Sequence, residues 1–294
     1  MFNRMFLERL EEQGHLNPQQ VADALATQRS TKVRLGTLAI EAHMMTEEQA
    51  ETINRQQAAQ NAHFGELAVK NKFLSQAQLA YLLDIQPREH VVLKQILHDK
   101  QYMQAEAVEA ELAAYRQELA LSDRDFERLL DNHVNTYVSK IAAIDGWENP
   151  ILTVYARIFL TTVIRLVDKD IAIRRASSVT DGSMPYAISI SLKGDATNAL
   201  VFSAGDVGGA IEFAGKFAEG FMGTTIDATD EIARDAMKEF LNCVGGLFTT
   251  ELTSKTHLSL DIEVPQFSDN FAVESEVIAL PFSCLTGDFT IFIH

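Results

Sequence analysis

The 294-residue sequence predicts an α+β protein with an N-terminal all-helical repeat domain, a helical connector, and a C-terminal domain with an antiparallel sheet and helices on one face. Three observations predict this organisation. The first 86 residues repeat with a period of 29, the next segment has apolar residues at helical spacing, and the second half mixes helical segments with alternating strands. We place the three domains at residues 1–87, 88–146 and 147–294.

Each copy of the repeat contains a polar residue that caps a helix and a glutamine near its end. The second and third copies share a glycine, Gly36 and Gly65, near which a shorter helix is expected to begin. Short paired helices that stack on one another are the architecture that such a repeat predicts. The capping residues are Asn17, Thr46 and Ser75, and the terminal glutamines are Gln28, Gln57 and Gln86.

Two stretches of the repeats resemble the N-terminal domain of type II secretion and pilus ATPases; they are Arg34-Leu35-Gly36 with Gln57, and Phe64-Gly65 with Gln86. In part of that family, two tandem repeats bind cyclic di-GMP through the Arg-Leu-Gly turn and the terminal Gln. The resemblance therefore implies Arg34, Gly36, Gln57, Gly65 and Gln86 as ligand-binding residues. Such a turn exposes backbone N–H groups to phosphate, and an Arg adds a bidentate charged contact.

The repeats also depart from that family's pattern. His63 stands where the second repeat would have an arginine, and His43 and Lys72 stand where a mid-repeat glycine is usual. A helical protein-docking module is the alternative interpretation, in which the glycines and glutamines are structural.

Pro87 disfavours a continued helix after the repeats. The apolar pattern of residues 89–140 then predicts two or three further helices. The segment contains His90, His98 and His133 but no histidine pair at i, i+4 spacing. Exposed or capping histidines are therefore expected rather than metal ligands. We predict no metal site in the chain.

The C-terminal domain is expected to contain a helix, three strands, two helices and three more strands. This order predicts helices on one face of a largely antiparallel sheet. Asp206 is expected to cap the second helix, and Gly194-Asp195 to form a turn. The expected helices are 149–167, 206–222 and 227–254, and the expected strands are 170–177, 185–193, 197–203, 257–264, 274–282 and 286–293.

The third of these helices presents two different faces. The expected packing face comprises Ile232, Ala236, Phe240, Val244 and Leu247, and the other comprises Asp235, Glu239, Asn242 and Gly246. An asparagine and two adjacent glycines disfavour a helix, so something other than helix stability selects them. One interpretation is a solvated face whose glycines allow close helix packing. The other is a docking surface that offers Glu239 and Asn242 to a partner, with the glycines clearing its approach.

The spacing Asp235-x3-Glu239-x2-Asn242, followed by Gly245, resembles the signature of the CheC/CheX/FliY chemotaxis phosphatases. The order of elements from about residue 149 to 294 resembles CheX. The resemblance implies a hydrolase that dephosphorylates the aspartyl phosphate of a CheY-type response regulator in two-component signalling. In that mechanism Asn242 orients the hydrolytic water and Glu239 pairs with the receiver's lysine.

The same resemblance assigns supporting roles to Asp235, Gly245 and Gly246. It also implies Mg²⁺ supplied by the receiver, no cofactor of the chain's own, and a homodimer formed through the sheet. The helix at 149–167 has no Glu-x2-Asn, so the match is to the single-site CheX pattern.

The composition and charge of the chain limit the classes of partner that it is expected to bind. The formal net charge of −16 argues against DNA or RNA binding, and the sequence has no apolar run of about 18 residues for membrane insertion. The start of the chain is amphipathic rather than a secretory signal, and the two cysteines, Cys243 and Cys284, suit a reducing compartment. We expect a cytoplasmic protein in which Cys243 is a small core residue rather than a redox site.

Two functions remain open from the sequence. The first is a receiver phosphatase that the N-terminal repeats regulate or localise. The second is a non-catalytic adaptor that binds cyclic di-GMP or a protein partner through the repeats. Asn242 separates them, because only the enzyme needs it. Arg34, Gln57 and Gln86 are needed only for nucleotide binding.

Overall fold

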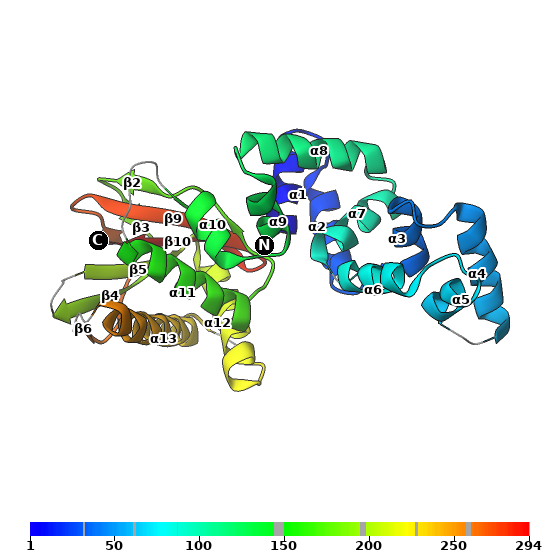
Figure 1. Ribbon diagram of the computed structural model, residues 1–294. Helices are drawn as coiled ribbons and strands as arrows, with labels where there is room; N and C mark the ends of the chain where they lie inside the picture. Colours follow the sequence, from blue (N-terminus) through cyan, green and yellow to red (C-terminus); the bar gives the residue numbers. More distant parts are fainter. Residues whose placement is uncertain are drawn as a thin grey trace. The chain divides into compact units, whose positions relative to one another are not determined.

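The computed structural model (Figure 1) describes most of the chain, and its element order is α+β, with helices first and an antiparallel sheet in the second half. None of the described helices is long and apolar enough to cross a membrane. The chain divides into two units, Phe6–Asp131, and Met1–Met5 together with Asn132–His294. The described residues are 1–31, 33–60, 63–86, 88–143, 150–194, 198–226, 229–256 and 260–293.

The first unit is all-helical in its described residues, and most of its helices follow one another in pairs. Polar residues begin the second helix of the first three pairs as expected. Asn17 Oδ1 accepts from Gln20 N at 2.9 Å, and Ser75 Oγ accepts from Gln78 N at 3.2 Å. Its helices are α1 (Phe2–Glu12), α2 (Pro18–Gln28), α3 (Leu35–Glu41), α4 (Glu47–Gln60), α5 (Phe64–Lys70), α6 (Gln76–Ile85), α7 (Glu89–Asp99), α8 (Ala105–Glu118) and α9 (Asp123–Leu130).

Among the described residues, the two helices of each of four successive pairs are joined by the same left-handed turn. Gly14, His43, Lys72 and Gln101 have φ of 78°, 52°, 61° and 58°, and successive members are 29 residues apart. In each turn the next residue donates its backbone N–H to the carbonyl five residues before it, at 2.8–2.9 Å; the donors are His15, Met44, Tyr102 and Phe73. The repeat therefore has a fourth copy, α7 with α8.

The sequence analysis missed this fourth copy for a physical reason. Gln104 stands at its N-cap and makes no side-chain capping bond, so the polar signature of the earlier copies is absent. The expectation of two or three helices over 89–140 is accordingly wrong, because α7 to α10 (Val134–Lys140) all lie there. Pro87 lies outside the described residues.

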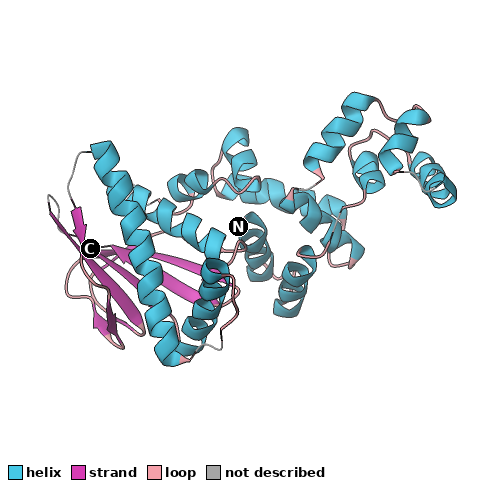
Figure 2. Ribbon diagram, turned by 90° about the horizontal axis from the view of Figure 1, so that it is seen from below, coloured by secondary structure: helices cyan, strands magenta, loops and turns pink. Residues whose placement is uncertain are grey.

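The second unit is an antiparallel sheet with α11 (Pro150–Leu166), α12 (Val207–Met222) and α13 (Asp230–Thr256) on one face (Figures 1 and 2). The strand order is β1-β9-β10-β5-β4-β6, with β2 also on β9, β7 also on β4, and β3 paired separately with β8. The strands are β1 (Ala172–Ile173), β2 (Ser177–Val179), β3 (Ser183–Met184), β4 (Ala187–Gly194), β5 (Asn198–Ala204), β6 (Leu260–Ile262), β7 (Gln266–Ser268), β8 (Phe271–Ala272), β9 (Val277–Cys284) and β10 (Gly287–Ile293).

Two expected strands need correction. The strand predicted at 170–177 is two short strands, because Ile173 and Ser177 are four residues apart while their partners on β9, Phe282 and Ala279, are three apart. One extra residue interrupts the ladder, as in a β-bulge. The strand predicted at 257–264 is β6, which ends at Ile262, and the prediction missed β7 and β8. Residues 146, 147, 149, 195, 197, 227 and 257–259, on which other predicted boundaries fall, lie outside the described residues.

Phenylalanine rings fill the space between the three helices and the sheet. Phe159 of α11 packs edge-on against Phe202 of β5, Phe240 of α13 and Phe282 of β9, with centroids 5.2, 5.3 and 5.6 Å apart. Phe213 of α12 lies 5.0 Å from Phe240. Such pairs stabilise by about 0.5–1.5 kcal/mol each beyond the area they bury. The rings thus fix α13 on the sheet.

The first residues of the chain belong to this second unit. Met1 and Phe2 are buried, and the Phe2 backbone N–H donates to Asn132 Oδ1 at 2.9 Å. Arg4 Nε donates to the Asp170 carbonyl at 2.6 Å. Helix α1 therefore begins in the second unit and continues into the first.

Candidate functional site

The exposed face of α13 carries the three side chains of the phosphatase-like motif. Asp235, Glu239 and Asn242 are all exposed. Spacings of four and three residues place them along one face of a helix, with neighbouring Cβ atoms roughly 5–6 Å apart. The sequence prediction that these residues share an exposed face is confirmed.

The packing face of α13 differs from the prediction. Phe240 and Val244 are fully buried as expected, but Ile232 and Leu247 are 41% and 46% exposed and Ala236 is half-buried. The error is one of helical phase, because Ala233, Met237 and Phe248 are buried one residue after the predicted positions. Helix α13 packs against both the sheet and its neighbouring helices. The hydrophobic side chains buried on it are those of Ala233, Met237, Phe240, Leu241, Val244, Phe248 and Leu252.

Gly245 faces the sheet and not a partner. A Cβ at this position would lie 3.3 Å from Ile190 Cδ1 and 3.6 Å from Ile262 Cδ1, so glycine allows α13 to approach β4 and β6 closely. Gly246 is half-buried, and its carbonyl accepts the Thr250 hydroxyl at 2.7 Å. The interpretation that both glycines clear a partner's approach is wrong for Gly245, which is a packing residue.

Phe240 determines where the motif side chains point. Its ring is enclosed by Phe159, Phe213 and Phe217, at centroid distances of 5.3, 5.0 and 5.5 Å. Because Phe240 lies between Glu239 and Asn242 in the sequence, anchoring it inward turns the other two outward. The site is therefore placed on a rigid, well-packed helix.

The electrostatics of this face are those of an exposed acidic surface. Lys238 Nζ lies 3.2 Å from Asp235 Oδ1, a surface pair of small energetic weight. Cys243 Sγ lies 3.9 Å from Glu239 Oε1, and burial together with the Glu239 carboxylate raises the pKa of the Cys243 thiol. Cys243 thus stays protonated and unreactive at neutral pH. Among the described residues no group of three or more His, Cys, Asp and Glu is arranged to hold a metal ion.

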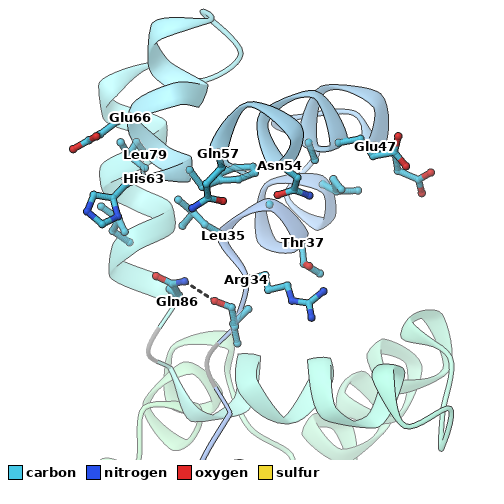
Figure 3. A pocket seen from close by; sticks show the side chains of 18 residues that line it. Arg34, Leu35, Thr37, Glu47, Asn54, Gln57, His63, Glu66, Leu79 and Gln86 are labelled. Carbon is cyan, nitrogen blue, oxygen red and sulfur yellow. Dashed lines mark hydrogen bonds between the residues drawn. The ribbon is translucent and has the colours of Figure 1, made fainter. Parts of the chain in front are cut away.

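A second candidate site is a cavity of about 1020 Å³ in the helical unit (Figure 3). It is lined by all five residues that the sequence analysis singled out for ligand binding, although they come from two different repeats. Gln86 Nε2 donates to the Val33 carbonyl at 2.5 Å, which ties the end of α6 to the segment before α3. The five residues are Arg34, Gly36, Gln57, Gly65 and Gln86.

The two glycines shape this cavity. A Cβ on Gly36 would lie 3.0 Å from the Phe64 ring, and one on Gly65 would lie 2.6 Å from Leu79 Cδ1. Both glycines therefore let successive repeats pack closely beneath the cavity. Arg34 and His63 are exposed N-cap residues of α3 and α5 and make no side-chain capping bond there.

The second unit is an α+β domain with three helices on one sheet face and an exposed Glu-x2-Asn on a packed helix. Comparison with known families identifies the domain itself, because residues 186–283 match the family model described as chemotaxis phosphatase CheX. The second unit thus contains a CheX-family domain. No curated protein matches the chain.

Solved structures of the same kind are similar to this chain. A chemotaxis protein CheX from Desulfovibrio desulfuricans has 16% identity and a TM-score of 0.42, covering 50% of this chain and 99% of that one. CheX from Vibrio vulnificus has 14% identity and a TM-score of 0.41, covering 49% and 98%. A CheX-CheY-BeF3-Mg complex from Borrelia burgdorferi has 18% identity and a TM-score of 0.38, covering 49% and 96%.

Proposed function

We propose that the chain is a phosphatase that hydrolyses the aspartyl phosphate of a CheY-type receiver. The observation that carries this proposal is the outward pair Glu239 and Asn242 on a helix that Phe240 anchors, within a CheX-family domain. A receiver that holds its own Mg²⁺ leaves little for a phosphatase to supply except a water molecule in line with the departing oxygen. The chain needs no cofactor of its own for this step.

In the proposed reaction Asn242 enters the receiver's active site. Its side-chain amide can donate and accept hydrogen bonds at once, so it can hold a water molecule with a lone pair directed at phosphorus. Glu239, one turn earlier on the same face, pairs with the receiver's lysine and fixes the docking geometry. Water attacks phosphorus, the bond to the aspartate oxygen breaks, and inorganic phosphate leaves with the receiver's carboxylate restored. Asp235 supports the acidic face beside them.

Phosphate release from a phosphorylated CheY-type receiver with Mg²⁺ tests the proposal. The wild-type chain should accelerate release above the receiver's own decay, and Glu239→Gln should lower this acceleration about tenfold or more, since a charge-assisted contact is lost. Glu231→Gln is the matched control, because Glu231 is an exposed glutamate on the same helix two turns away. No acceleration with any of several receivers would favour the adaptor function.

We further propose that the N-terminal repeats bind cyclic di-GMP and thereby regulate or localise the phosphatase. Support comes from the single cavity that gathers Arg34, Gln57 and Gln86 from two repeats. Arg34 supplies a bidentate cation for a phosphodiester, and the two amides match the donor and acceptor edges of purines. Isothermal titration with cyclic di-GMP tests it; Arg34→Ala should abolish most of the affinity, and an unchanged affinity would contradict the assignment.

The resemblance to CheX also leads us to propose a homodimer formed through the sheet. Sedimentation equilibrium tests this proposal, with twice the mass of one chain as the expected result and a single-chain mass as the contrary one.

A further inference from the structure

Among the described residues where α12 ends and α13 begins, three large apolar side chains are exposed. Phe221 and Met222, at the end of α12, are 53% and 57% exposed, and Ile232, in the first turn of α13, is 41% exposed. Gly223 ends α12 with a φ of 70°, and its backbone N–H donates to the Glu219 carbonyl at 2.9 Å. Grouped apolar side chains at a surface mark an interaction site, whereas single ones do not. We call Phe221, Met222 and Ile232 the apolar patch.

The apolar patch is continuous with the aromatic core that holds the motif helix. The Phe221 ring stacks on the Phe217 ring, with centroids 5.3 Å apart, and Phe217 packs edge-on against Phe240 at 5.5 Å. Phe217 and Phe240 are buried, so this line of rings reaches the surface at Phe221. Because stacking already restrains the Phe221 ring, a partner that covers it costs little further side-chain entropy. Aromatic residues and methionine are also the apolar residues enriched at protein interfaces.

The apolar patch lies within reach of any protein that is seated on the motif. Ile232 is seven residues before Glu239, a spacing of two turns that places both side chains on one face of α13. Asn242 is ten residues after Ile232, which is about 15 Å along the helix axis. An interface of ordinary size covers about 800 Å² of each partner and is therefore roughly 30 Å across. A partner that covers Glu239 and Asn242 thus covers Ile232 as well.

The charged groups beside the apolar patch provide orientation more than affinity. Glu231, Asp235 and Glu239 are exposed on α13, and Lys238 pairs with Asp235 at 3.2 Å. Exposed charge pairs contribute little binding free energy, although they select a partner surface of opposite sign and speed its encounter. The main source of affinity at this surface is therefore the burial of apolar area.

We propose that the apolar patch is the docking anchor for the receiver on which Glu239 and Asn242 act. This inference rests on the proposed phosphatase function and adds a division of roles within one surface. The patch holds the receiver, and Asn242 acts on the hydrolytic water. Because the patch contacts the receiver equally in the ground state and in the transition state, it lowers KM and leaves kcat unchanged.

The initial rate of phosphate release as a function of receiver concentration tests the inference. Phe221→Ala should raise KM about tenfold and Ile232→Ala severalfold, with kcat within about twofold of wild type. Alanine is a better helix former than isoleucine, so a higher KM in Ile232→Ala cannot result from a weakened α13. Val207→Ala is the matched control, because Val207 is 47% exposed at the other end of α12, about 20 Å from Phe221 along the axis, and KM should not change.

Calorimetric titration with the same receiver, Mg²⁺ and beryllium fluoride as the phosphoryl mimic measures affinity apart from turnover. The dissociation constant should rise in Phe221→Ala and Ile232→Ala as KM does, and it should stay at the wild-type value in Val207→Ala. Circular dichroism confirms that each variant is folded, which substitutions of exposed side chains should not disturb.

The outcomes separate the inference from the proposal beneath it. Phosphate release by wild type with unchanged KM and affinity in both patch variants would overturn the anchor and leave the phosphatase function intact. Binding that Phe221→Ala weakens, without phosphate release by wild type, would support the anchor and overturn the phosphatase function. No binding and no release by wild type would overturn both. A lower sedimentation mass in Phe221→Ala with unchanged KM would assign the patch to a second copy of the chain and overturn the inference.

Discussion

Phe240 links the core of the CheX-family domain to its candidate site. It is fully buried among aromatic rings of α11, α12 and the sheet. Phe240→Ala should lower the free energy of unfolding by about 3–5 kcal/mol, through lost transfer energy and a cavity. Urea denaturation measures this, with Phe221→Ala, 53% exposed, as a control expected to cost less than about 1 kcal/mol. Equal effects of the two changes would contradict the assigned packing.

His90 gives the helical unit a pH-dependent stability. Burial, followed by the charge of Lys94, lowers the pKa of His90 to about 4. Because this value is below that of an unfolded histidine, near 6.5, the group contributes stability above about pH 6.5 that is lost as pH falls toward 4. His90→Phe should remove up to about 2–3 kcal/mol of that loss.

Thermal unfolding of wild type and His90→Phe at several values between about pH 7 and 4 measures the difference. His98→Phe is the control, since the His98 side chain is 56% exposed. Parallel pH curves for wild type and His90→Phe would contradict a buried, neutral His90.

At the scale of elements, the repeated turn between paired helices uses non-glycine residues in a left-handed conformation. A non-glycine residue in this conformation destabilises the folded state by roughly 1 kcal/mol relative to glycine. Glycine offsets part of this difference, because it gives the unfolded chain more conformational entropy. Lys72→Gly and Gln101→Gly should each raise the free energy of unfolding by about 0.5–1 kcal/mol, whereas Gly14→Ala should lower it by a similar amount. Denaturant titration of the three variants checks this, and a destabilised Lys72→Gly would contradict it.

The sequence analysis identified elements wherever side chains carry a local signal. The capping residues Asn17 and Ser75, the Asp206 cap and the exposed face with Glu239 and Asn242 were all predicted, because each depends on helical spacing or on a bond to a near neighbour. The fourth repeat was missed because Gln104 stands at its N-cap, where the earlier copies have Asn17, Thr46 and Ser75.

Long-range packing was the other limit of the sequence analysis. The inward face of Gly245 depends on Ile190 and Ile262, residues distant in sequence, and the bulge after Ile173 depends on its register with β9. The apolar periodicity of a single segment predicts neither the orientation of Gly245 nor the bulge. The cavity of the helical unit shows the opposite case, since the resemblance of the repeats to a known family had already grouped five residues that line it.

At the scale of the whole molecule, the first five residues connect the two units. Phe2 is 2% exposed, in the unit that holds the CheX-family domain, while α1 belongs to the helical unit from Phe6 onward. Phe2→Ala should lower the stability of the CheX-family domain by about 3–5 kcal/mol, although it lies more than a hundred residues from it in sequence. Hydrogen exchange of the sheet amides measures this; unchanged protection would show that the segment is dispensable.

The proposed phosphatase function depends most directly on Asn242. The measurement that tests it is the initial rate of phosphate release as a function of receiver concentration, for wild type and Asn242→Ala. Positioning of the water predicts that kcat falls about a hundredfold or more while KM changes little, because the contact acts on the reacting water and not on docking. A wild-type kcat in Asn242→Ala, from a folded protein, would contradict the account.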